Sequence, residues 1–224
     1  MPAASSPSSP AEPEKAARPR RRRQGELQRR QKEETRQKLL SSAHAVFAES
    51  GYNATSVDMI VEEAEVSRTS FYRHFDDKYA VAQALFSELI PEVQRRWRAL
   101  LAVPEPTLDD VVAWVTSYVE LLEENRVLIG VLREVDAIEV RAQQRVLDYH
   151  NDLLAVMAAR VPKLRAEAGD GAVLRARALL LLLQVDQFSY AMSIRNWSFQ
   201  RSVMIAAMAA LIHEFLVFAE GGGG

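Results

Sequence analysis

The chain has 224 residues, enough for one or two domains with a substantial hydrophobic core. It contains no cysteine, which excludes disulfides, thiolate metal sites and cysteine nucleophiles and fits an intracellular protein. The formal net charge is −2, but residues 18–38 hold ten basic and three acidic side chains (+7), whereas residues 79–224 hold 14 basic and 18 acidic ones (−4). A basic front segment on an acidic body predicts that this end binds a polyanion.

The longest apolar runs, 178–183 and 203–212, are shorter than the roughly 20 residues that span a bilayer, so we expect a cytoplasmic protein without a membrane segment.

Residues 1–30 are rich in Pro, Ala, Ser and Arg and contain almost no large apolar side chain. Such a segment cannot bury enough surface to offset its ordering entropy, so it is predicted to be a disordered basic arm. Its arginine run, 20–23, has two interpretations. It is either a solubilising tail or an arm that lies along DNA phosphates or enters the minor groove.

Residues 33–78 carry the pattern of three short helices. In the first, apolar residues recur at three- and four-residue spacing and Gly51 follows as a C-terminal glycine. The second begins near Thr55 or Ser56, and the third is capped by Ser67. Two short helices joined by a tight turn, with another helix behind them, predict a helix-turn-helix. The predicted inward residues are Leu39, Leu40, Ala43, Val46, Phe47, Val57, Ile60, Val61, Ala64, Phe71 and Phe75.

If Phe71 and Phe75 face the core, the opposite side of the third helix presents Thr69, Tyr72 and Arg73, with Arg68 and Ser70 at its exposed start. Arginine can fork onto guanine, and hydroxyl groups can reach base edges or phosphates. The alternative is an ordinary solvated helix face. The basic arm and the absence of acidic residues from 67 to 75 favour DNA.

The stretch TSVDMIVEEAEVSRTSFYRHFDDKYAVAQAL resembles the DNA-binding segment of the TetR family of bacterial transcriptional regulators. The resemblance covers about residues 39–85 and includes Thr55, Ala64, the turn at Val66-Ser67 and the Phe71-Tyr72-x-His74-Phe75…Lys78 pattern. It implies a homodimer with an all-helical ligand-binding and dimerisation body, which represses or activates genes by binding a palindrome-like operator. It also implies that Arg68, Thr69, Ser70 and Arg73 face bases. Phosphates would be faced by Thr55, Ser56, Tyr72, His74 and Lys78, and the cap Ser67 completes the set of predicted DNA-binding residues.

One residue departs from the family pattern. Glu65 stands in the turn where family members usually have glycine. A side chain at positive φ costs on the order of 1 kcal/mol, so the tilt of the reading helix depends on how the turn absorbs this strain.

The remainder, residues 79–220, is predicted to be a helical ligand-binding and dimerisation domain, with a flexible glycine tail at 221–224. Helices are expected at 78 to about 101 with a break at Pro91, and at 108–124, 127–135, 140–159, 173–194 and 199–218. The last two helices are apolar on most faces and must therefore be buried on most faces. Alanines at 206, 207, 209 and 210 permit close approach and favour a seam between two copies, with a purely intramolecular core as the alternative.

Polar residues within these apolar stretches are the candidates for a small-molecule site, because such sites are mostly apolar with a few placed polar groups. A buried Asp186 would need a partner, and Arg133, the other subunit or a ligand are the options. Trp114 and Tyr118, one turn apart on the same helix, fit the core better than a pocket. The predicted ligand-binding residues are Trp114, Tyr118, Tyr149, Gln184, Asp186, Gln187 and Tyr190.

Enzymatic motifs are absent from the sequence: the four histidines are scattered, and there is no phosphate loop, nucleophile elbow or His-Glu-x-x-His. We therefore expect no metal, no cofactor and no enzymatic activity. An all-helical enzyme with a dispersed apolar site, or a helical protein-binding adaptor, are the alternatives. The prediction is an all-α regulator, most simply a repressor, that binds double-stranded operator DNA as a homodimer through its last two helices and is released by a small, mostly apolar effector.

Overall fold

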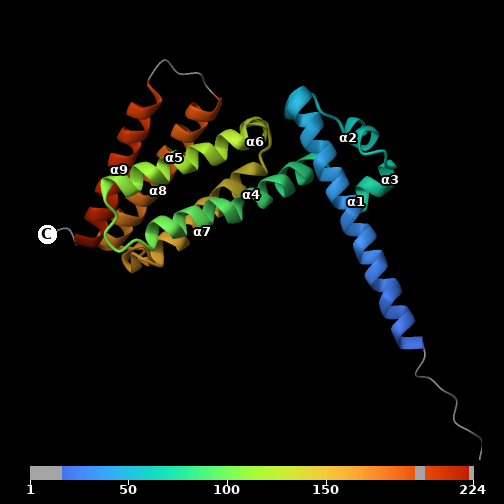
Figure 1. The fold of residues 1–224 in the computed structure, drawn as a ribbon, viewed down its shortest axis with the longest axis horizontal. Coiled ribbons are helices and arrows are strands. Elements are labelled where there is room, and N and C mark those ends of the chain that lie inside the picture. The colour runs from blue at the N-terminus through green and yellow to red at the C-terminus, as the bar shows by residue number, and fades with distance from the viewer. Residues whose placement is uncertain (1–16, 195–199, 222–224) are drawn as a thin grey trace, which may run out of the picture.

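The computed structural model describes residues 17–194 and 200–221, and within those ranges every regular element is a helix (Figure 1). The predicted all-α class is therefore confirmed. The predicted arm residues 1–16 and tail residues 222–224 lie outside the described residues. In chain order the elements are α1 (Ala17–Ala54), α2 (Val57–Glu63), α3 (Arg68–Tyr72), α4 (Lys78–Leu101), α5 (Leu108–Glu124), α6 (Arg126–Ile138), α7 (Ala142–Ala158), the 3-10 turn η1 (Pro162–Arg165), α8 (Gly169–Ile194) and α9 (Arg201–Gly221).

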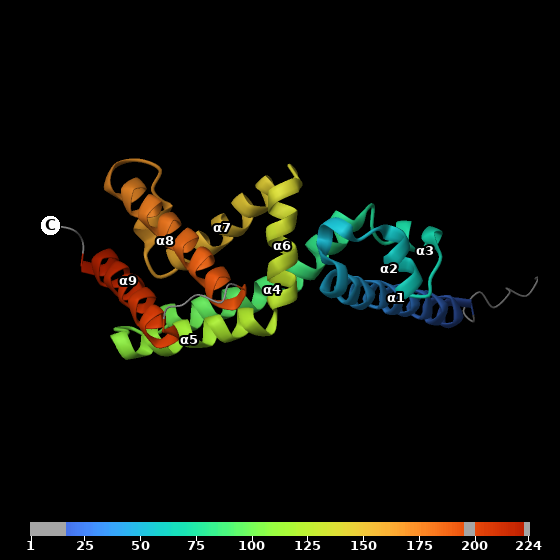
Figure 2. The same cartoon turned by 90° about the horizontal axis from the view of Figure 1, so that it is seen from above.

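The small N-terminal lobe is formed by the second half of α1 with α2, α3 and the start of α4, as Figures 1 and 2 show. Its centre contains Leu39, Tyr52, Ile60 and Phe71, all fully buried. Gly51 has φ 73° and ψ 168°, so it interrupts the helical geometry near the end of α1, where the sequence predicted a C-terminal glycine.

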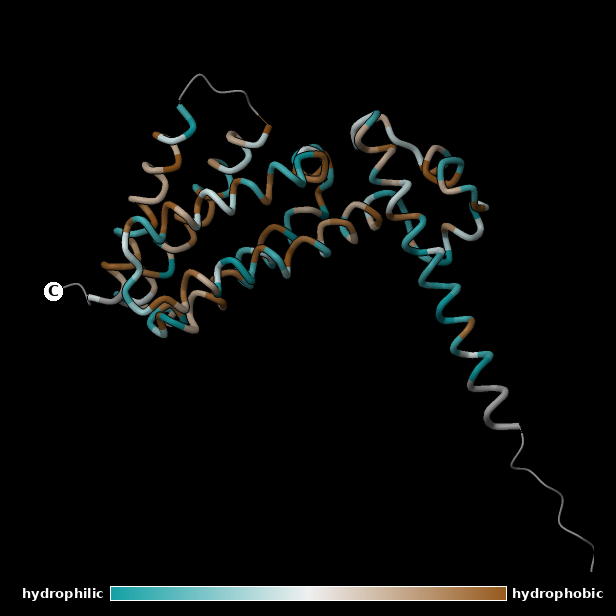
Figure 3. Tube along the Cα trace, in the orientation of Figure 1, coloured by the Kyte–Doolittle hydropathy of each residue, from teal (hydrophilic) through white to brown (hydrophobic). Residues whose placement is uncertain are grey.

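Helix α1 extends much further toward the N-terminus than the sequence predicted. The disorder expected up to residue 30 is wrong for residues 17–30, which are helical and continuous with the rest of α1. Figure 3 shows that the described part of this extension is mostly polar. A polar segment can still be helical because Arg, Gln, Glu and Lys have high helix propensity. Side-chain pairs one turn apart, Arg30–Glu34 and Gln37–Glu33, add support.

Helices α4 to α9 form the larger lobe, with Trp97 of α4 fully buried at its centre. The break predicted at Pro91 is wrong: α4 continues through it. Proline removes one helical hydrogen bond, but Leu89 and Val93 are buried on either side and anchor both halves of the helix. The other predicted body helices are present with ends that differ by a few residues.

Candidate functional site

The helix-turn-helix is held by two serine caps. Ser56 accepts a hydrogen bond from the backbone N–H of Met59 at 3.3 Å, and Ser67 accepts one from Ser70 at 3.1 Å. Glu65, in the turn between them, has φ 49°, so the turn keeps the left-handed conformation with a non-glycine residue and does not adopt another shape. The short helix α3 is thereby set at a defined angle to α2, with Phe71 buried beneath it.

The outer face of α3 is exposed. Arg68, Thr69, Tyr72 and Arg73 all face solvent, while Ser70 is half-buried. Arg68 forms an ion pair with Asp58 of α2, with Nε 2.7 Å from Oδ1, and both side chains are 62% exposed. Such an exposed pair is weak and can exchange for a ligand contact. The structure thus brings the predicted reading residues together on one accessible surface.

Two of the residues predicted to contact DNA, Thr55 and Lys78, have structural roles in the small lobe. Thr55 is buried, and its hydroxyl donates to the carbonyl of Gly51 at 2.7 Å. Lys78 donates from Nζ to the carbonyls of Tyr52, Asn53 and Thr55 at 2.9, 3.2 and 2.8 Å. Lys78 thereby fastens the end of α1 to the start of α4, whereas the Thr55 hydroxyl stabilises the end of α1 itself; contacts from these two residues to DNA phosphates stay a prediction.

A basic groove lies between the extension of α1 and helix α3. Its free volume is about 980 Å³, and its lining includes Arg29, Lys32, Arg73 and His74. Within the described part of the chain, none of the first three lies within ion-pair distance of a carboxylate. The pKa of His74 is held below its usual value by burial and by the positive charges of Lys32, Arg73 and Arg36. This groove therefore carries unpaired positive charge next to α3, although Glu34 also lines it.

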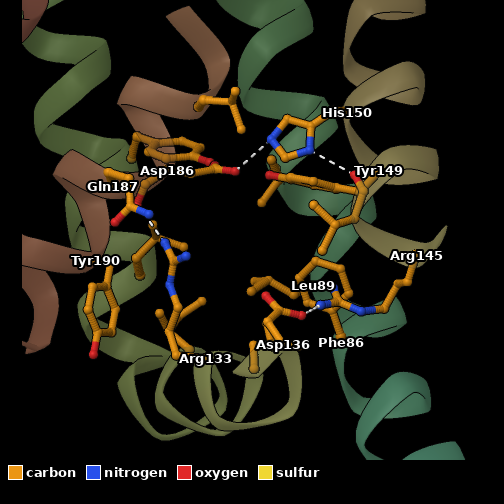
Figure 4. Close-up of a pocket in the computed structure, with 17 residues that line it drawn as sticks. Phe86, Leu89, Arg133, Asp136, Arg145, Tyr149, His150, Asp186, Gln187 and Tyr190 are labelled. Atoms are coloured by element: carbon orange, nitrogen blue, oxygen red, sulfur yellow. Dashed lines mark hydrogen bonds and ion pairs between the residues drawn. The ribbon is translucent and has the colours of Figure 1, made fainter. Parts of the chain in front are cut away.

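The larger lobe contains a partly open cavity of about 140 Å³, shown in Figure 4. Its walls come from α4, α5, α6, α7 and α8, and most of them are apolar. The lining residues are Phe86, Leu89, Val93, Tyr118, Leu122, Ile129, Leu132, Arg133, Asp136, Arg145, Val146, Tyr149, His150, Leu183, Asp186, Gln187 and Tyr190.

Asp186 in this cavity is paired with His150 of α7, with Oδ2 3.0 Å from Nε2. The other ring nitrogen of His150 lies 2.7 Å from the carbonyl of Val146. Burial disfavours the charged imidazole, but these two contacts and the negative charge of Asp186 outweigh it and raise the pKa of His150. The partner suggested by the sequence, the side chain of Arg133, is not the observed one: Arg133 donates to the backbone carbonyl of Asp186 at 3.3 Å.

The other polar groups of the cavity include two tyrosines and a second ion pair. Burial, followed by the charge of Asp186, raises the pKa of both Tyr118 and Tyr149, so both stay neutral at physiological pH. Arg145 is paired with Asp136, and its guanidinium lies 4.7 Å from the centre of the Phe86 ring. Arginine and carboxylate side chains therefore neutralise one another on this wall.

Five of the seven predicted ligand-binding residues line the cavity: Tyr118, Tyr149, Asp186, Gln187 and Tyr190. Trp114 does not, because it packs against Trp97 at 4.5 Å between ring centres and donates from Nε1 to the carbonyl of Arg96. Gln184 lines a separate groove between α8 and α9. Asp136, Arg145 and His150 were not among the predicted cavity residues. They lie on the amphipathic helices α6 and α7, where spacing alone does not distinguish a cavity-lining polar residue from a surface one.

The two lobes are joined by polar contacts from α6 and the start of α7. Glu134 accepts from the backbone N–H of Asn53 at 2.9 Å, and Glu139 accepts from the hydroxyl of Tyr52 at 2.7 Å. Arg141 donates to Asp77 at 2.9 Å. Because α6 also carries Arg133, one helix touches both the cavity and the small lobe.

Helices α8 and α9 expose apolar side chains on one face. Val173 and Leu180 of α8 are each 60% exposed, as are Val203 (57%) and Val217 (58%) of α9. The stretch Arg201–Ala219 is the one described segment whose length and mean hydropathy of 2.0 would suffice to cross a bilayer, and only 39% of it is buried. The apolar character predicted for these helices is thus present, but a large part of it is uncovered in a single copy.

Residues 39–85 match the family model described as "Bacterial regulatory proteins, tetR family". The chain is 31% identical over 96 residues to the HTH-type transcriptional repressor DhaR of Mycobacterium sp. (strain GP1), a match that covers 42% of this chain and 48% of the repressor. The chain thus spans about half the length of that curated relative. A crystal structure assigned to the TetR family, from Syntrophomonas wolfei, has a TM-score of 0.62 at 19% identity and covers 85% of this chain and 97% of its own. FadR from Bacillus subtilis, solved in complex with stearoyl-CoA, has a TM-score of 0.58 at 17% identity, covering 82% and 98%.

Proposed function

Because this chain belongs to the TetR family of bacterial regulatory proteins, we propose that it is a cytoplasmic, ligand-responsive repressor that binds a palindrome-like operator as a homodimer. The observation that carries this proposal is the exposed face of α3, with Arg68, Thr69, Tyr72 and Arg73 on a capped helix-turn-helix. Recognition helices read base edges in the major groove with such side chains. The chain is proposed to have no enzymatic activity.

The basic groove supports the same partner. Arg29, Lys32 and Arg73 line it without carboxylate partners among the described residues. Phosphate contacts supply most of the sequence-independent affinity for DNA. We therefore assign α3 to base recognition and the groove beside it to the phosphate backbone.

The exposed apolar face of α8 and α9 supports the homodimer. An uncovered patch of this kind is typical of an interface, and a two-fold axis buries the same face of both copies. Two reading helices related by such an axis would address half-sites about one DNA turn apart. Leu180→Glu combined with Val217→Glu is expected to produce monomers in sedimentation velocity.

The cavity supports the ligand response. It is enclosed by helices from α4 to α8, and α6 connects it to the DNA-binding lobe through Glu134. A molecule that favours one position of α6 would change the separation of the two reading helices, and operator DNA would in turn weaken the binding of that molecule. A mostly apolar effector fits the lining.

The test is selection of binding sites from random duplex DNA, followed by measurement of affinity. Arg68→Ala is expected to relax the preference at one base position by roughly 1–3 kcal/mol. Tyr72→Phe is expected to weaken binding similarly on all sequences. Arg98→Ala, at the far end of α4, is the matched control. If no sequence is enriched, or if Arg68→Ala leaves the selected sequence unchanged, the assignment of α3 as a reading helix is wrong.

A further inference from the structure

The free volume of this cavity matches a compact molecule. Its volume is about 140 Å³, close to that of an engineered apolar cavity of about 150 Å³ that holds one benzene molecule. Phe86, Leu89, Val93 and Ile129 contribute apolar walls. The body of the ligand is therefore about the size of a single ring or a comparably compact aliphatic group.

Both carboxylates that line the cavity already have partners. Asp136 is paired with Arg145, whose side chain is only 12% exposed. The Oδ2 atom of Asp186 lies 3.0 Å from His150, whose side chain is 7% exposed. A cationic ligand would compete with these buried partners for the carboxylates, and displacing one would leave an unpaired buried charge.

Arg133 differs from these groups. Its guanidinium has five N–H donors, and the acceptor bonded to it within the described residues is the carbonyl of Asp186 at 3.3 Å. No carboxylate of the described chain lies within ion-pair distance of it. One face of the guanidinium lies 4.7 Å from the centre of the Tyr190 ring. Figure 4 shows Arg133 rising from α6 along one side of the cavity, toward Asp186 and Gln187.

We propose that this cavity binds a small monocarboxylic acid, with its carboxylate on Arg133 and its compact apolar body against the walls from α4 and α6. The proposal rests on the proposed function and names the chemical class of its effector. Arginine is the side chain whose donor geometry matches a carboxylate in two parallel hydrogen bonds. The raised pKa of His150 adds positive charge to the same cavity at mildly acidic pH, which favours an anion further.

The first measurement uses the unmodified protein without DNA and three ligands of equal ring size: benzoate, benzyl alcohol and benzylamine. Isothermal titration at neutral pH is expected to show benzoate binding roughly 10- to 100-fold more tightly than benzyl alcohol, the range that charged hydrogen bonds give. Benzylamine is expected to bind most weakly. Equal affinities, a preference for benzylamine, or no binding of benzoate at millimolar concentration would each overturn the proposal.

The second measurement tests whether the carboxylate of the ligand binds to Arg133. Arg133→Gln is expected to remove the preference for benzoate over benzyl alcohol, whereas Arg126→Gln, on the exposed start of the same helix, should retain it. If Arg133→Gln does not fold, the ligand series on the parent protein still decides the class. Operator selection is measured separately, so loss of DNA binding with intact benzoate recognition would refute the proposed function and leave the ligand class standing.

Discussion

The carboxylate of Glu134 accepts a hydrogen bond from the backbone N–H of Asn53, with 2.9 Å between Oε2 and the nitrogen. Asn53 is the penultimate residue of α1, the longest helix of the small lobe, and Glu134 follows Arg133 directly on α6. Consecutive residues of one helix therefore face the cavity and the joint between the lobes. A shift of α6 at the cavity reaches the small lobe without an intermediate element.

Glu134→Ala is expected to loosen this joint. Without the acceptor, the amide hydrogen of Asn53 should exchange with solvent roughly threefold to tenfold faster, as loss of a hydrogen bond worth about 1 kcal/mol predicts. Hydrogen exchange followed by NMR is the measurement. Glu134→Gln retains an acceptor and should have a smaller effect, and Glu49→Ala on the exposed face of α1 should have none. An unchanged exchange rate would show that the contact does not hold the lobes together.

Lys78→Met is expected to destabilise the protein. The substitution retains the aliphatic stem but removes the three hydrogen bonds to the carbonyls at the end of α1. The free energy of unfolding in urea should fall by about 2–3 kcal/mol, since hydrogen bonds from charged groups are the strong ones. Lys163→Met, an exposed lysine of η1 in the larger lobe, is the control. If Lys78→Met weakens DNA binding while the free energy of unfolding stays the same, Lys78 contacts a phosphate, as the family resemblance implies, and its structural role is minor.

Glu65→Gly is expected to stabilise the turn of the helix-turn-helix. Glu65 has φ 49°, a region that glycine occupies without steric cost. Its exposed ion pair with Lys38 contributes little. We expect a gain of roughly 1 kcal/mol in the free energy of unfolding. Glu63→Gly, within α2, should instead lose about 1 kcal/mol. A loss at both positions would show that Glu65 is not strained.

The His150–Asp186 pair predicts a pH dependence of stability. Because the pKa of His150 is raised in the folded protein, the pair stabilises it fully below about pH 6.5, and this contribution is lost as pH rises through the raised value. The stability difference between the parent and Asp186→Asn should therefore shrink with rising pH. His74, whose pKa is lowered, contributes equally to both proteins and cancels in the difference. Urea unfolding between pH 5 and 9 is the measurement, with Asp152→Asn as the exposed control, and a difference independent of pH would contradict the prediction.

The basic groove predicts a change in the salt dependence of DNA binding. Arg29→Gln together with Lys32→Gln should reduce the slope of log affinity against log salt by about 2, since each phosphate contact contributes about 0.9. Arg30→Gln is the matched control, because Arg30 is paired with Glu34 and its side chain is 80% exposed. Deletion of residues 1–30 should flatten the slope further. An unchanged slope in the double variant would show that the groove does not contact phosphates.

The sequence by itself determined the helical class, the helix-turn-helix and the inward residues of the small lobe. Local signals suffice for these features: Ser56 and Ser67 cap helices through neighbouring backbone groups, Gly51 marks a left-handed residue, and apolar spacing places Phe71 and Phe75 inward. The strain at Glu65 could also be predicted, because it depends on backbone conformation at one turn.

Only the tertiary structure decided which polar groups meet. Lys78 stabilises the end of α1 because the fold places its ammonium group within hydrogen-bonding distance of three carbonyls that lie more than 20 residues earlier in the sequence. Asp186 pairs with His150 rather than with the side chain of Arg133, because α7 packs beside α8 and places the His150 imidazole next to the carboxylate. Because Asp186 pairs with His150, the guanidinium of Arg133 keeps donors for another acceptor. Charge pairing between distant helices depends on their packing, and no periodicity along one segment encodes it.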